Sequence, residues 1–428
     1  MSLRALSCLL SLILLSGCAT GRASRDGSCV ITAKPTPQKQ PISWHVLNVT
    51  LRHLLSVSHL LPLGSTGDRV DGVVADSAFF TNRSVGTLSP EAVRNGPTPS
   101  SQRPLPPFTV TRLKDEGKTA GFFVTDAAGA RFLFKLDLVD QPELVTGAEV
   151  VTSKLLHALG YYVPSYEIVT FHPQEVTVSP TAHVEAEDLQ ELLAPRLRQG
   201  QVRASASRIV DGQILGPFQF QRFRSCACLR ALKLAYAWVN NTDAKDHNTL
   251  MVWTGDRAIG YLIDFGSAFG ADADHGPKGP CQGWLYDVDL ANWTVEALTL
   301  GLARNGCDHR EQPWSSAVGL FSPRCDPRRW KPYVPNLAFD AMSLADAQWM
   351  ATRLAALSHA QLEAAVAAGH YGRSEDARRI LEVLEARRAA ILQVYASATV
   401  PEVYPGRHLE PSQPLEHPSS VPIPRMGR

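Results

Sequence analysis

The sequence has little excess charge, no long apolar stretch beyond its first residues and few recognisable catalytic motifs. Its 428 residues carry a formal net charge of +1, so a strongly basic face and bulk binding of nucleic acid are not expected. It contains no Gly-x-Ser-x-Gly motif and no paired histidine site, which argues against a hydrolase. Hydrophobic residues make up 44%, enough for a sizeable core, and the length allows two or three domains, or one large domain with extensions.

The first 18 residues are predicted to be a targeting segment and not part of the fold. Arg4 gives a short positive region, and the apolar run from Leu9 to Leu15 is too short to span a membrane as a mature helix. Leu15-Ser16-Gly17-Cys18 follows and resembles the lipobox of bacterial lipoproteins. The resemblance implies cleavage before Cys18, a diacylglycerol anchor on its thiol and, with Ala19 next, an outer-membrane location in the cell envelope. An ordinary signal peptide with an incidental cysteine is the alternative.

The later cysteines agree with export to an oxidising compartment. Six remain after Cys18, an even number that permits disulfides. Cys307 and Cys325 bracket a loop with proline and tryptophan and could be bridged; buried thiols are the alternative. Cys226 and Cys228 lie too close together for a zinc knuckle and lack a second pair.

The most informative stretch, from Asn240 to Gly266, holds two acidic clusters joined by a strand, a turn and a second strand. The hairpin is expected to bring Asp264 back beside the first cluster, so that Asp243, Asn248 and Asp264 converge. Carboxylate and amide oxygens suit a hard cation such as Mg²⁺, which shares its remaining ligands with phosphates. A calcium-type loop or a merely solvated acidic loop is the alternative.

The pattern Asp-x-Lys-x-x-Asn, followed by Asp-Phe-Gly, resembles the catalytic and metal loops of the protein-kinase-like fold. The resemblance implies that ATP is the phosphoryl donor and that Asp243 accepts the proton of a substrate hydroxyl. It also implies that Lys245 neutralises the transferring phosphate, and that Asn248 and Asp264 hold Mg²⁺. The identity of the hydroxyl acceptor does not follow.

Residues 108–137 predict a three-strand meander with a glycine loop and a lysine on its third strand. The order is similar to that of the kinase-like small lobe, and the resemblance implies that Gly117 and Gly121 cover phosphates and that Lys135 binds them. There is no Gly-x-Gly-x-x-Gly, so the loop resemblance depends on these two glycines. A plain surface lysine is the alternative for Lys135.

A helix is predicted to begin near Thr146, with Glu149 in its first turn, and to end at Gly160. The resemblance implies that Glu149 fixes Lys135 by an ion pair, with Glu143 as a rival partner. A helix-terminal carboxylate stabilised by the helix dipole is the alternative. The run from Ala148 to Pro164 resembles atypical kinases such as the HipA-type toxins and the phosphoinositide-kinase-like group.

Beyond Gly266 the chain offers weaker signals. Asp272, Asp274 and His275 lie in a glycine-rich loop, and we expect no metal there. No Ala-Pro-Glu marker follows, which argues against ordinary docking of protein substrates. The last predicted helix, 375–395, is amphipathic with four arginines on its solvent face: Arg378, Arg379, Arg387 and Arg388.

The predicted fold class is α+β, a two-lobed protein-kinase-like fold with a small β-rich N-lobe, a mainly helical C-lobe and an N-terminal extension. The predicted function is ATP- and Mg²⁺-dependent phosphoryl transfer, and a pseudokinase-type binding protein without turnover is the alternative. The expected segments are a signal peptide at 1–18, a flexible tether at 19–41, the extension at 42–107, the N-lobe at 108–171, an insertion or lid at 172–220, the C-lobe at 221–398 and a disordered tail at 399–428.

Overall fold

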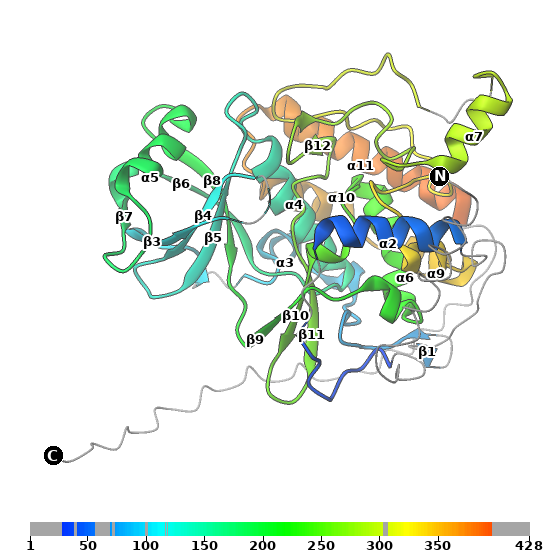
Figure 1. Ribbon diagram of the computed structural model, residues 1–428, viewed down its shortest axis with the longest axis horizontal. Coiled ribbons are helices and arrows are strands. Elements are labelled where there is room, and N and C mark those ends of the chain that lie inside the picture. Colours follow the sequence, from blue (N-terminus) through cyan, green and yellow to red (C-terminus); the bar gives the residue numbers. More distant parts are fainter. Residues whose placement is uncertain are drawn as a thin grey trace, which may run out of the picture. The chain divides into compact units, whose positions relative to one another are not determined.

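The chain folds into a sheet-rich N-terminal part followed by a largely helical C-terminal part, as predicted for the α+β class (Figure 1). The predicted signal peptide at 1–18, the predicted lipid site Cys18 and the predicted tail at 399–428 lie outside the described residues. The computed structural model describes residues 28–37, 41–55, 69–70, 73–98, 102–115, 117, 119–302 and 307–395.

The largest sheet has six strands in the order β6-β8-β5-β4-β3-β7, antiparallel throughout except for the β3–β7 pair. One face buries a phenylalanine cluster that includes Phe108, Phe122 and Phe134, covered by leucines of α5 (Ala186–Leu193). The strands are β3 (Phe108–Leu113), β4 (Gly121–Thr125), β5 (Arg131–Leu136), β6 (Tyr166–Phe171), β7 (Val176–Val178) and β8 (Val202–Arg208).

The segment 172–220, predicted as an insertion or lid, is part of this sheet. Its strand β8 forms hydrogen bonds to β5 on one side and to β6 on the other. Strand β9 (Gln213–Gly216) then joins the hairpin of β10 (Thr249–Trp253) and β11 (Ala258–Leu262). The small lobe therefore extends well past Phe171, because β8, an interior strand of its sheet, comes from the segment that was predicted to be an insertion or lid.

Helix α4 (Leu144–Leu159) packs on the opposite face of the sheet, and all of its residues except His157 are buried. The carboxylate of Asp137 accepts hydrogen bonds from the backbone N–H groups of Val145 and Thr146 at the helix start. It thereby satisfies two of the N–H groups that a helix leaves without intrahelical partners. Gly160 ends the helix at φ +110°, where a Cβ would lie 2.4 Å from Phe80 and from the Thr81 carbonyl.

The helical part is built around α6 (Ala227–Val239), which is buried along nearly its whole length. Three helices close this part, α9 (Leu344–Ala355), α10 (His359–Ala367) and α11 (Ser374–Tyr395), the last where it was predicted, and the short α8 (Leu337–Asp340) precedes them. Inside this bundle, Arg230 of α6 forms a buried ion pair with Asp346 of α9 at 2.7 Å.

The prediction that Arg387 faces solvent is wrong. Its guanidinium is buried and donates to the carbonyls of Trp238, at 2.9 Å, and Ala237, at 2.5 Å, in the last turn of α6. Carbonyls in the last turn of a helix lack the regular intrahelical donor, so the arginine supplies one, and the Ala237 carbonyl also accepts from the Asn240 N–H at the helix end.

The chain ahead of the N-terminal extension is already bound to the core near its first described residues. Cys29 forms a disulfide with Cys226, its carbonyl accepts from Ala78, and the Ile31 carbonyl accepts from Ala258 of β11. The tether predicted for 19–41 is therefore attached to the fold at Cys29 and Ile31. The remaining elements of the extension are α2 (Ile42–Leu55), β1 (Arg69–Val70), β2 (Val73–Val74) and α3 (Pro90–Asn95).

The second disulfide joins Cys281 to Cys307, so the suggested Cys307–Cys325 bridge is wrong. Cys325 remains a thiol, and burial raises its pKa. In the described part of the chain, no helix is both long and apolar enough to cross a membrane.

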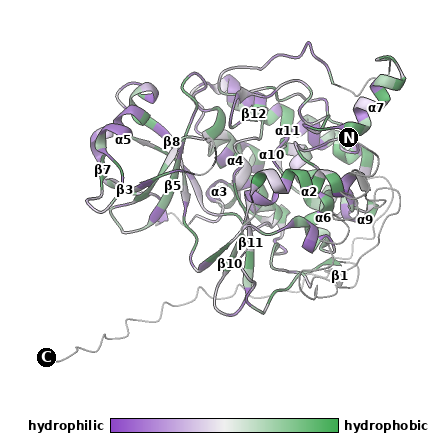
Figure 2. Ribbon diagram, in the orientation of Figure 1, coloured by the Kyte–Doolittle hydropathy of each residue, from purple (hydrophilic) through white to green (hydrophobic). Residues whose placement is uncertain are grey.

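Helix α7 (Leu290–Leu298) projects from the helical part in Figure 1 and carries hydrophobic residues along its length in Figure 2. None of its residues is buried, and Trp293 and Leu298 are exposed. The helix is thus held at its N-terminus, where Asp289 accepts from the Asn292 N–H and pairs with Lys331 at 2.5 Å.

Candidate functional site

Three charged side chains from three separate elements meet where the sheet faces the helical part. Lys135 of β5 places its Nζ 2.6 Å from Glu149 Oε1 on α4 and 2.9 Å from Asp264 Oδ1, just after β11. The Lys135 and Glu149 side chains are 6% and 0% exposed, whereas Asp264 is 35% exposed and thus borders solvent. The rival Glu143 lies elsewhere, at the start of α4, and accepts from the Gly372 N–H.

Strand alternation explains how β5 delivers the lysine. Phe134 and Leu136 point into the phenylalanine cluster, so Lys135 between them faces α4. Gly121 is opposite Lys135 in β4, and a Cβ at this position would lie 2.4 Å from the Phe134 carbonyl. Gly121 therefore belongs to the strand next to the lysine and not to the loop itself, while Gly117 lies in the loop with φ +74°.

The three charges shift one another's titration. Burial alone would lower the pKa of Lys135, but the negative charges of Asp264 and Glu149 raise it above its ordinary value. Burial raises the pKa of Glu149 to about 7, against the pull of Lys135. Burial also acts to raise the pKa of Asp264, but Lys135 and Lys245 together with a hydrogen bond to Glu149 outweigh it and lower that pKa to about 2. Asp264 is therefore the carboxylate that stays fully charged at neutral pH.

The Asp-Phe-Gly residues are each fixed by a separate contact. Asp264 adopts a left-handed backbone, φ +63°, which costs a non-glycine residue on the order of 1–3 kcal/mol and recurs at functional sites. Phe265 is buried against the ring of Tyr166. A Cβ at Gly266 would lie 2.8 Å from Val145 of α4, so a glycine lets this loop approach the helix.

The first acidic cluster forms a loop directly after α6, with its functional groups close together. Lys245 Nζ donates to Asp243 Oδ2 at 2.7 Å, and Asn248 Nδ2 donates to the Asp243 carbonyl at 2.8 Å. Burial would lower the pKa of Lys245, but Asp243, aided by Asp264, raises it. The cluster thus presents one carboxylate held by a permanently charged lysine.

Hydrogen bonds from neighbouring segments to the backbone carbonyls of this loop hold it in place. The Thr242 carbonyl accepts from the Tyr333 N–H, and the Ala244 carbonyl accepts from Asn336 Nδ2. Asp246 points away from the site, because it accepts from the Phe220 N–H and lies 3.3 Å from His45 of α2.

The residues fit a hard divalent cation. The Asn248 carbonyl accepts from the Ile263 N–H, which sets Asn248 beside Asp264. Because the Asn248 amide nitrogen is used by Asp243, its side-chain oxygen is the atom left to face a ligand. Asp264 is partly exposed and Asn248 is buried beside it, and a carboxylate and an amide oxygen are ligands that Mg²⁺ accepts.

Lys114 is a further cation at this site that the sequence did not reveal. It follows β3, and its Nζ donates to the Thr119 carbonyl at 2.9 Å, under the loop that carries Gly117. Burial and the nearby charge of Lys135 lower its pKa, while Asp264 and Glu149 act in the opposite direction. No pattern distinguishes a lysine at the start of a polar loop, so only the fold shows that it shares the site.

The ligand atoms of Asp272, Asp274 and His275 lie within 4.8 Å of one another. Asp272 also accepts from the Asp274 N–H and from Gln282 Nε2. These hydrogen bonds account for the close approach of the three side chains. The absence of a metal here stays a prediction.

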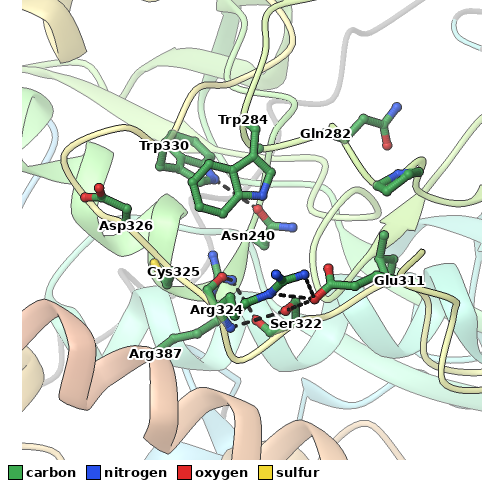
Figure 3. Close-up of a pocket in the computed structure, with 13 residues that line it drawn as sticks. Asn240, Gln282, Trp284, Glu311, Ser322, Arg324, Cys325, Asp326, Trp330 and Arg387 are labelled. Carbon is green, nitrogen blue, oxygen red and sulfur yellow. Dashed lines mark hydrogen bonds and ion pairs between the residues drawn. The ribbon is translucent and has the colours of Figure 1, made fainter. Parts of the chain in front are cut away.

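A separate small pocket, open to solvent, borders the helical part and includes none of the predicted site residues (Figure 3). Its wall contains Trp284 and Trp330, and Trp330 Nε1 donates to Asn240 Oδ1 at 2.9 Å. Arg324 lines the same pocket and pairs with Glu311. Asn240 ends α6 three residues before Asp243, so the pocket adjoins the base of the loop.

Comparisons with known proteins give little independent guidance. No protein-family model and no curated protein matches the chain. Among solved structures, the chain is similar to the Helicobacter pylori proinflammatory kinase CtkA, with a TM-score of 0.35 and 11% sequence identity. The similarity covers 67% of this chain and 96% of that one. This TM-score is too low for the similarity to establish a shared function.

Proposed function

We propose that this protein transfers a phosphoryl group from a magnesium-bound nucleotide, ATP, to a hydroxyl group. The observation that carries the proposal is the contact of one buried lysine, Lys135, with Glu149 and Asp264 together. A buried ion pair is weak evidence for stability alone, because desolvation offsets much of the attraction. A lysine fixed between two carboxylates next to a solvent-facing edge is instead suited to hold a phosphate chain in one position.

Each residue has a distinct task in this proposal. Lys135 binds the non-transferred phosphates, and Glu149 keeps its ammonium group aimed at them. Asp264 and Asn248 hold Mg²⁺, which supplies charge neutralisation between the phosphates when bound. Asp243 accepts the proton of the acceptor hydroxyl, and Lys245 stabilises the charge that develops on the transferring group.

We further propose that a lipid on Cys18 anchors the protein in a bacterial envelope. The two disulfides support an oxidising location. The 11 residues from Cys18 to Cys29 span at most about 40 Å, and Cys29 is fixed to the core by its disulfide. A lipid on Cys18 would thus keep the folded part close to the membrane surface, and the acceptor hydroxyl would be one that is accessible there.

The test uses the chain purified in detergent and mixed with envelope extract, γ-labelled ATP and Mg²⁺. It measures the transfer of label to components of the extract. Asp243→Asn should lower transfer about 10²–10⁴-fold, the usual contribution of a positioned base. Asp256→Asn, at an exposed hairpin turn, is the matched control and should transfer like wild type. Equal transfer by Asp243→Asn and wild type would refute the assignment of the base. Nucleotide binding without transfer by wild type would favour the non-catalytic binding protein.

A further inference from the structure

Two cysteines and a histidine form a cluster outside the proposed active site. Cys281 follows the segment that begins at Asp264, and Cys307 and His309 lie on a later loop. Cys281 and Cys307 are joined as a disulfide, with both residues partly exposed and His309 exposed.

The histidine is placed almost equally close to both sulfur atoms. Nε2 of His309 lies 3.8 Å from Cys281 Sγ and 3.9 Å from Cys307 Sγ. Ligand atoms bound to one tetrahedral Zn²⁺ lie roughly 3.3–3.8 Å apart, given bonds of about 2.0–2.3 Å, so the observed S···N distances are within a few tenths of an ångström of this range. The imidazole therefore already stands where a third ligand would be needed, and only the two sulfurs must separate.

The loop that carries the histidine is held in place by charge pairs. Arg324 lies 3.0 Å from Asp308 and 2.5 Å from Glu311, on either side of His309. These pairs do not involve the sulfur atoms, so they do not depend on the disulfide for their partners.

We propose that reduction of the Cys281–Cys307 disulfide converts this cluster into a zinc site with Cys281, Cys307 and His309 as ligands. Two thiolates and an imidazole are ligands that Zn²⁺ prefers, and the exposed side leaves room for water as the fourth ligand. The oxidised chain cannot bind the ion in this way, because both sulfur atoms are used in the covalent bond. The proposal is independent of phosphoryl transfer.

The reductant is a dithiol. One of its thiolates attacks one sulfur of the disulfide, forms a mixed disulfide and releases the other sulfur as a thiolate. Its second thiol then displaces the mixed disulfide, so the chain gains two electrons and two protons and the reductant leaves as its own disulfide. Binding of Zn²⁺ releases the two protons from the cysteines.

The two disulfides differ in exposure, which makes selective reduction feasible. Cys29 and Cys226 are 2% and 0% exposed, whereas the Cys281–Cys307 pair is partly exposed. Brief treatment of the full chain with dithiothreitol, followed by its anaerobic removal and by alkylation of a sample, should therefore mark Cys281 and Cys307 before Cys29 and Cys226.

The decisive experiment titrates oxidised and briefly reduced chain with Zn²⁺ against a chromophoric chelator, with Co²⁺ as a spectroscopic substitute. Reduced wild type should bind one more Zn²⁺ than oxidised wild type and than a reduced Cys281→Ser, Cys307→Ser variant, which retains all other cysteines. The Co²⁺ form should show thiolate-to-metal charge transfer.

His309→Ala should lower the affinity of the reduced chain at least about tenfold, since even the loss of an outer partner of a ligand costs 10–100-fold. His359→Ala is the matched control, an exposed histidine paired with Glu385, and should bind like wild type. Equal Zn²⁺ binding by oxidised and reduced wild type, or by the double cysteine variant, would overturn the proposal. Unchanged affinity in His309→Ala would overturn the three-ligand site.

Discussion

Replacing Lys135 by methionine should damage both stability and nucleotide binding. The substitution removes the cation that lies 2.6 Å from Glu149, a carboxylate with no exposed side-chain surface. Removing one partner of a buried ion pair costs about 3–5 kcal/mol, because the other charge stays buried without compensation. We expect a loss of this size in the free energy of unfolding at pH 8, measured by denaturant titration, and loss of nucleotide binding.

The cost should depend on pH in a defined direction. Burial already raises the pKa of Glu149 to about 7, and without Lys135, which lowers it, this pKa must rise further. An acid whose pKa is higher in the folded than in the unfolded state destabilises the fold as pH rises above its unfolded value of about 4.5. The stability deficit of Lys135→Met should therefore be smaller at pH 5 than at pH 8.

A matched control separates the two effects. Lys154 is another buried lysine of the small lobe, paired with Glu167 at 2.8 Å, but it lies outside the site. Lys154→Met should also lose stability but should keep nucleotide binding. If Lys135→Met is as stable as wild type at pH 8, or if both variants bind nucleotide equally well, the account of Lys135 is refuted.

Three further predictions concern other residues. Cys18→Ser should release the protein from membranes or block its processing; unchanged fractionation and gel mobility would contradict a lipid anchor. Lys114→Met should weaken nucleotide binding about tenfold in a titration, because a hydrogen bond from a charged group usually contributes about that much. An unchanged affinity would show that Lys114 does not bind the nucleotide. Burial lowers the pKa of His157 to about 3. The unfolded chain therefore gains a proton below about pH 6.5 that the fold rejects, which lowers stability by up to about 1.4 kcal/mol per pH unit. His157→Gln should lose less stability between pH 7 and pH 4 than wild type. An equal loss in both proteins would show that His157 does not cause the loss of stability in acid.

The pairing of Lys135 with Glu149 and the return of the chain at Asp264 could be anticipated because each signal is local, whereas the contact of Lys135 with Asp264 was not predicted. Strand alternation sets the direction of Lys135, a helix signal precedes Glu149, and the hairpin of β10 and β11 returns the chain to Asp264. Short-range patterns of this kind do not depend on which distant segments pair.

Features that depend on distant pairing could not be predicted. Strand β8 has alternating alanine and serine without a strong apolar pattern, so nothing local places it between β5 and β6. Helical periodicity assigns Arg387 to solvent, but its guanidinium lies in the core and donates hydrogen bonds to the carbonyls that end α6. Spacing does not determine disulfide pairing, so the bond between Cys29 and Cys226, 197 residues apart, had no sequence signal.

The most direct test of the central claim is an ATP titration, with Mg²⁺, of wild type, Asp264→Ala and Asp243→Ala, read as a shift in melting temperature. At 100 times the dissociation constant, wild type should gain about 2.7 kcal/mol of stability, and removal of Mg²⁺ should abolish most of the gain. Asp264→Ala should lose the shift, because it removes the charged metal ligand. Asp243→Ala should keep it, because Asp243 faces the acceptor and not the nucleotide. Equal affinity in all three proteins, or no Mg²⁺-dependent shift in wild type, would contradict the account.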